Sequence, residues 1–340
     1  VFLASNSGGV FDLFDVESLE VLRGPQGTLF GRNTIGGVIN VQRTEPTGEW
    51  GAKLEATAGD EKRTDLKAVI NLPLGENGGI KLSLKDTQSV SHVYNTTING
   101  RRDFKDSQTA SMSLKYNFGD STSAMITFDD YDHDTTAPDN VFVATGVLAS
   151  IGYGAGSIAS EADDWKTSPQ LTPLTARLKG ENTTIKLTHE TENHQIKYIM
   201  GIMDYDEDVS EVSWGLGPDS GNGVFFPVDR IQTFKQTSHE IQIISDLDGP
   251  LNYVAGLYYL EADSYIKSGP AILFRSDHEL EATAVFGEMS YDLSDIWSVT
   301  LGARYTEEDK TLVARSWAAK NLAAWAAQSE DQTLMSSYST

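Results

Sequence analysis

The sequence lacks three features that would place it in common protein classes. No uninterrupted apolar stretch in its 340 residues is long enough for a membrane-spanning helix. The opening residues have no basic start followed by a long apolar centre, so no signal peptide is predicted. Cysteine is absent, which fits a bacterial envelope protein but discriminates little, because many cytosolic proteins also lack it. Membrane strands are not excluded, because they alternate apolar and polar residues.

Positive charge is also scarce in this chain. Lysine and arginine together number 26 against 49 acidic residues, which gives a formal net charge of −23. Such a balance would repel the phosphates of a nucleic acid, so nucleic acid is excluded as a partner. We interpret the acidic excess as a solvated surface.

Patterns for catalysis and metal binding are missing as well. The six histidines are scattered without ligand spacing, and the spacing supports no Ser/His/Asp arrangement. The run GYGAG at 152–156 lacks the spacing of a dinucleotide fingerprint and is interpreted as a loop. Acidic runs at 129–134 and 204–208 could hold a divalent cation at the outer rim, but they are more typical of solvated strand ends. We therefore predict no enzyme, no cofactor and no metal site.

The most informative segment that is present runs from Glu17 to Val41, with the sequence ESLEVLRGPQGTLFGRNTIGGVINV. Strand-like apolar pieces flank a centre in which glycine permits positive φ and close backbone approach. A phosphate-binding loop would need Lys and then Ser or Thr after its last glycine, but Gly36 is followed by Gly37 and Val38. The motif residues are Arg23, Gly24, Pro25, Gly27, Gly31, Arg32, Gly36 and Gly37.

Period-two alternation of apolar and polar residues dominates the chain after residue 48. Many of the alternating segments reach or exceed the ~9–11 residues that cross a bilayer at a tilt, whereas globular strands average only ~5–6 residues. About eleven antiparallel strands are predicted, near 50–59, 62–72, 79–89, 106–118, 122–132, 183–191, 195–207, 230–246, 251–266, 280–293 and 296–312.

The connections between these strands alternate between short and long, except for a short first hairpin at 60–61. Outer-membrane barrels have short periplasmic turns and longer outer loops, so the pattern favours a membrane barrel over a soluble sandwich. The long connections are predicted at 90–105, 133–182, 208–229 and 267–279. The loop 133–182, with Tyr153 and Trp165, is predicted to help capture a ligand together with the last two.

The segment 17–41 resembles the end of the plug domain of TonB-dependent outer-membrane receptors, and the hairpins at 251–263 and 284–310 resemble barrel hairpins of the same family. The resemblance implies an all-β fold, a transmembrane antiparallel β-barrel with the C-terminal part of a plug. Residues 1–45 would belong to the plug and 46–340 to the N-terminal half of the barrel, with about 11 of about 22 strands. The chain is accordingly expected to be a fragment, with Lys320–Thr340 in an unfinished outer loop.

The resemblance also implies a function, namely energy-coupled uptake of a scarce, bulky solute across the bacterial outer membrane. A ferric siderophore is the expected cargo, and vitamin B12, haem and oligosaccharides remain open. The expected partners are the TonB–ExbB–ExbD energy-transducing complex, outer-membrane lipid and the siderophore-like ligand. The alternatives are a passive diffusion channel, which would not need a plug, and a soluble all-β module.

In receptors of this type, plug arginines can pair with barrel glutamates that face the lumen. Glu240 shares a strand face with Ser238 and Gln242, and Glu288 shares one with Ser290. Pairing would offset the desolvation cost of these charges. We therefore predict that a latch of Arg23, Arg32, Glu240 and Glu288 fastens the plug to the wall, although each charge could instead face lumen water.

Overall fold

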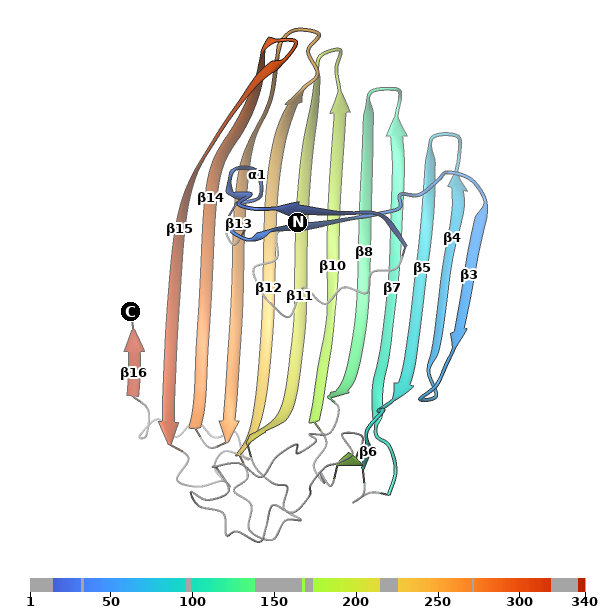
Figure 1. Ribbon diagram of the computed structural model, residues 1–340, viewed down its shortest axis with the longest axis vertical. Coiled ribbons are helices and arrows are strands. Elements are labelled where there is room, and N and C mark those ends of the chain that lie inside the picture. The colour runs from blue at the N-terminus through green and yellow to red at the C-terminus, as the bar shows by residue number, and fades with distance from the viewer. Residues whose placement is uncertain are drawn as a thin grey trace.

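The fold is dominated by one antiparallel sheet of twelve strands, in which the long strands pair in chain order (Figure 1). The computed structural model describes residues 15–31, 34–95, 99–137, 167–168, 174–214, 226–270, 272–318 and 336–339. The strands are β3 (Gly51–Ala58), β4 (Thr64–Leu74), β5 (Gly78–Val90), β7 (Asp103–Phe118), β8 (Thr122–Ala137), β10 (Leu174–Glu190), β11 (His194–Trp214), β12 (Phe226–Ser245), β13 (Leu251–Pro270), β14 (Ile272–Ser294), β15 (Trp297–Ala318) and β16 (Ser336–Ser339).

Alternation along each strand separates the two faces of this sheet. Leu257 on β13 is 57% exposed, whereas Gln236 on the adjacent strand β12, which lies on the other face, is only 2% exposed. The same holds for Ser238, which is buried, and Ile241, which is exposed. Large apolar side chains therefore cover the outward face, and the inward face carries many polar ones. The inward face also holds a buried apolar cluster of Tyr131, Leu178, Met203, Tyr205, Phe234 and Ala262. An exposed apolar exterior is the arrangement of a membrane barrel wall.

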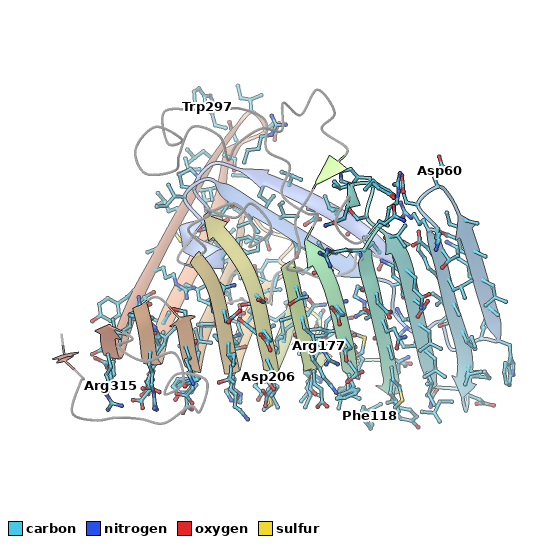
Figure 2. All side chains as sticks on the ribbon, turned by 90° about the horizontal axis from the view of Figure 1, so that it is seen from below. Asp60, Phe118, Arg177, Asp206, Trp297 and Arg315 are labelled. Atoms are coloured by element: carbon cyan, nitrogen blue, oxygen red, sulfur yellow. The ribbon has the colours of Figure 1, made fainter. Side chains whose placement is uncertain are left out.

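A small two-stranded sheet lies across the inward face of the large one (Figure 1). It consists of β1 (Val16–Arg23) and β2 (Gly37–Arg43), with the four-residue helix α1 (Gly27–Phe30) between them. Figure 2 shows the large sheet curving around this hairpin. We call the segment from residue 15 to residue 44 the plug hairpin. Two further short strands, β6 (Tyr94–Asn95) and β9 (Thr167–Ser168), pair in parallel.

All eleven predicted barrel strands are present, and most are longer than predicted at the end that carries the long connections. Strand β10 begins at Leu174 rather than near 183, and β14 begins at Ile272 rather than near 280. The prediction of a long loop at 267–279 is wrong, because β13 continues to Pro270 and Lys267 pairs with Arg275. At this end of β10 Ala176 and Leu178 still alternate with polar residues, but Leu178 is buried whereas Leu187 is exposed, so the apolar side of the strand changes face. In β14 residues 275–279 are all polar. The pattern of the membrane-crossing part is lost at both ends although the backbone ladder continues.

The remaining predicted loops are shortened for the same reason. Strand β8 runs to Ala137, and β11 runs to Trp214, so the acidic runs at 129–134 and 204–208 lie inside strands and not at strand ends. Tyr153, Trp165 and the segment 215–225 lie outside the described residues, as do 319–335. Part of the expected terminal loop is a strand, since β16 at Ser336–Ser339 pairs with β15.

Short turns gather at one end of the sheet and longer connections at the other, except for the short connections after β3 and β13. The turns after β4, β7, β10, β12 and β14 are at the top in Figure 1, as the predicted parity requires. Among the residues that the structure describes, no helix is long and apolar enough to cross a membrane.

Candidate functional site: the contact between the plug hairpin and the sheet wall

The plug hairpin owes its shape to its glycines. Gly24 and Gly31 have φ values of +84° and +79°, which favour glycine because it has no Cβ. Gly37 has a φ of +143°, and a Cβ built there would lie 2.4 Å from the carbonyl oxygen of Leu22. The glycines of the sequence motif therefore let β1 and β2 turn back on one another at close range.

Helix α1 brings the tip of the hairpin against β14 and β15. A Cβ on Gly31 would lie 3.2 Å from the guanidinium of Arg304, and one on Gly302 would lie 2.8 Å from the methyl group of Thr28. The Arg304 guanidinium also lies over the rings of Tyr258 and Phe286, at 5.7 and 5.1 Å from their centroids. Small residues on both sides thus allow close approach of the plug tip to the wall.

The base of the hairpin is fixed by a buried ion pair between Asp15 and Lys81 of β5. The Nζ atom of Lys81 lies 2.5 Å from Oδ2 of Asp15, and the two side chains are 1% and 8% exposed. The same ammonium donates to the carbonyl oxygen and the hydroxyl of Thr44, so it joins the two ends of the hairpin to the wall. Burial raises the pKa of the Asp15 carboxyl, but hydrogen bonds from Lys81 and Thr44 outweigh it, and the pKa lies below its ordinary value.

A second contact joins Arg43, the last residue of β2, to the neighbouring strands. Its Nη1 lies 2.6 Å from Oδ1 of Asp129 on β8, and its Nη2 donates to the Ser111 hydroxyl of β7 over 2.8 Å. Asp129 belongs to one of the acidic runs that were considered as metal ligands. In the structure this carboxylate binds a plug guanidinium instead.

The third contact involves Glu45, directly after the hairpin. Its two carboxylate oxygens accept from Lys115 of β7 at 2.6 Å and from Lys186 of β10 at 3.3 Å. Burial raises the pKa of the Glu45 carboxyl, but the hydrogen bond from Lys115 and the charge of Lys186 lower it further than burial raises it. Glu45 therefore stays ionised and ties the exit of the plug hairpin to two wall strands.

The structure describes three of the four residues of the predicted latch, Arg23, Glu240 and Glu288. Among the described residues, Arg23 forms no ion pair with Glu240 or Glu288, and it is exposed. Arg32 lies outside the described residues, so its pairing stays a prediction. Glu240 accepts from Gln242 at 2.6 Å, and Ile241 and Met289, which alternate with the two glutamates, are exposed.

Sequence reasoning missed the three contacts that the structure does describe. Their wall residues carried a signal, because Lys81 and Lys115 fall on the polar side of alternating segments. Nothing in the sequence indicated which plug residues would meet them across gaps of more than sixty positions.

The acidic runs do not form a metal site in the described part of the chain, where no group of three or more potential ligands comes together. Their outward-facing carboxylates are paired with cations instead, Asp132 with Arg177 at 2.8 Å and Asp204 with Lys235 at 2.9 Å.

Comparisons with known proteins agree with this geometry. Residues 3–38 match the TonB-dependent Receptor Plug Domain family. The metal-pseudopaline receptor CntO of Pseudomonas aeruginosa is 28% identical over 141 residues, which cover 38% of this chain and 18% of CntO. The pesticin receptor of Yersinia pestis is 56% identical over 34 residues, which cover 10% of this chain and 5% of that receptor.

The fold is also that of a solved receptor. The crystal structure of the ferric yersiniabactin uptake receptor FyuA from Yersinia pestis superposes with a TM-score of 0.77 and 16% identity, over 96% of this chain and 48% of FyuA. The chain thus spans about half the length of the solved receptor and less of the curated relatives. The start of the chain thus matches the plug domain of TonB-dependent receptors, and the hairpin held inside a curved antiparallel sheet has the fold of the solved receptor FyuA.

Proposed function

We propose that the protein containing this chain takes up a ferric siderophore across the bacterial outer membrane, with energy supplied through TonB. The observation that carries the proposal is the plug hairpin, which lies across the inward face and is tied to it by charged side chains at Asp15, Arg43 and Glu45. A passive channel has no use for a segment of this kind. The named relatives, a metal-pseudopaline receptor and a ferric yersiniabactin uptake receptor, support the choice of cargo.

The charged contacts between the plug hairpin and the wall suit a plug that must be held in place and later released. Ion pairs hold a seated plug firmly when water is excluded, but water and counter-charges can replace them once the plug moves. A core of interlocked apolar side chains would have no such replacement. In this proposal the TonB–ExbB–ExbD complex supplies the pull, and the apolar outward face of the sheet contacts outer-membrane lipid.

The proposal also assigns a role to each part of the chain. Residues 1–45 serve as plug and 46–340 as barrel wall, and a pairing of Arg32 with Glu240 or Glu288 would add a further contact near the plug tip. No catalytic step is assigned to any residue, and the protein acts as a transporter and not as an enzyme.

The proposal is tested by uptake of iron-55 siderophores in cells that carry or lack the complete gene. We expect accumulation of at least one ferric siderophore, and we expect it to stop when TonB is deleted or the proton gradient is collapsed. Uptake that persists without TonB would contradict the proposal and favour a passive channel. Uptake of vitamin B12, haem or an oligosaccharide in place of every siderophore would overturn the assignment of cargo.

A further inference from the structure

A polar cavity of about 200 Å³ lies in the inward face, beside the plug exit and close to the short turns after β7 and β10. Its wall carries the ammonium groups of Lys115, Lys186 and Lys197, with Glu45 and Glu190 as the acidic members. Three lysines around one cavity are unusual in a chain with a net charge of −23. The cavity therefore has the charge of a site for an anion.

Backbone register explains how these lysines come together. Lys115 of β7 and Lys186 of β10 both lie directly opposite Met125 of β8, so they stand in one row across three strands. Lys197 of β11 pairs with Thr188, two residues further along β10 on the same face. Each lysine is about 5 Å from Met125 at Cβ, so the two lysines are about 10 Å apart there, and their long side chains converge on one carboxylate between them.

Glu45 provides that carboxylate in the seated state. It bridges Lys115 and Lys186, whereas Lys197 forms no ion pair with any residue that the structure describes. Glu45 follows the plug hairpin directly, and it would leave the wall if the hairpin moved. Its departure would leave three lysines against Glu190 alone.

We propose that this cavity is an anion-binding site of the transport path, occupied by Glu45 when the plug is seated and by a carboxylate or phosphate group of the solute when the plug is displaced. The inference rests on the proposed function, because it assigns one step of the passage. Charge-assisted hydrogen bonds from lysine to an anionic oxygen are roughly twice as strong as neutral ones, and Ser123, Thr188 and Gln195 add neutral polar groups to the lining. An anionic solute would thus be drawn along the wall and would delay the return of Glu45.

The test uses the full-length receptor in detergent and two probes, succinate and inorganic phosphate, with binding measured by calorimetry. Glu45→Gln removes the resident carboxylate and is expected to tighten binding of at least one probe by tenfold or more relative to the unmodified receptor. Glu45→Gln combined with Lys186→Gln and Lys197→Gln should lose that binding. Equal binding by all three proteins, or no gain in Glu45→Gln, would overturn the proposal.

A matched control separates the cavity from a general change in charge. Glu55→Gln removes one negative charge from an exposed pair with Lys67 on β3 and β4, outside the lining of the cavity, and it should leave anion binding unchanged. Lys197→Gln alone keeps the ion pairs of Glu45 and should still weaken probe binding at least threefold, so the test does not depend on a triple variant that folds poorly. Failure of uptake with intact, lysine-dependent anion binding would refute the proposed function and leave the site standing.

Discussion

The ion pair between Asp15 and Lys81 gives the sharpest prediction about how the plug is held. Lys81→Met keeps the length of the side chain but removes its charge and its hydrogen bonds to Asp15 and Thr44. Removal of one partner from a buried ion pair costs about 3–5 kcal/mol. Asp15 keeps its bond with the Thr44 hydroxyl, so we expect the lower end of that range.

A loss of about 3 kcal/mol corresponds to a rise on the order of a hundredfold in the population of the unseated plug hairpin, since each 1.4 kcal/mol is a factor of ten. The chain offers a direct assay, because it contains no cysteine. Ser83→Cys places a single thiol on β5 at a position that is fully buried in the structure. The rate of maleimide labelling then reports how often the hairpin leaves this part of the wall.

Lys81→Met should raise the labelling rate of this thiol on the order of a hundredfold. Lys67→Met, which breaks an exposed pair with Glu55 between β4 and β3, serves as the control and should change little. The double variant Asp15→Asn with Lys81→Met should recover most of the protection, because it leaves no uncompensated buried charge. A labelling rate within threefold of the parent, or no recovery in the double variant, would refute the reasoning.

Three further predictions concern the plug exit and the wall. The pKa of Glu45 is lowered, so its contribution to holding the plug hairpin is full above its unfolded pKa of about 4.3 and is lost as pH falls through the folded value. Acid-protease cleavage within 15–45 should rise in that pH window, and Glu45→Gln should flatten the rise. Gly180→Ala would place a Cβ 2.6 Å from the backbone oxygen of Asp204 and should cost about 1–3 kcal/mol of stability in urea, whereas Gly51→Ala, which meets nothing within 4 Å, should cost far less. Leu257→Arg on the outward face should cost about 2–4 kcal/mol if it lies at bilayer depth, and unchanged stability in lipid would contradict a membrane position.

The sequence determined the type of fold and the identity of the strands. Eleven alternating segments became eleven paired strands, because a period of two forces successive side chains onto opposite faces whatever the partner strand is. Gly24, Gly31 and Gly37 were identified because positive φ is a local property of the backbone. The strand end at 174–182 was missed because its apolar residues lie on the opposite face from those of the rest of β10, and the start of β14 was missed because residues 275–279 are all polar.

Only the tertiary structure decided which charges hold the plug. Asp15 meets Lys81 across sixty-six positions, and Glu45 meets Lys186 across one hundred and forty-one. These pairs depend on the strand register and on the angle at which the hairpin crosses the wall, and neither leaves a trace in local spacing. The alternation of polar and apolar residues predicts that the lysines face inward, but the position of the whole hairpin inside the curved sheet determines which charged residue each lysine meets.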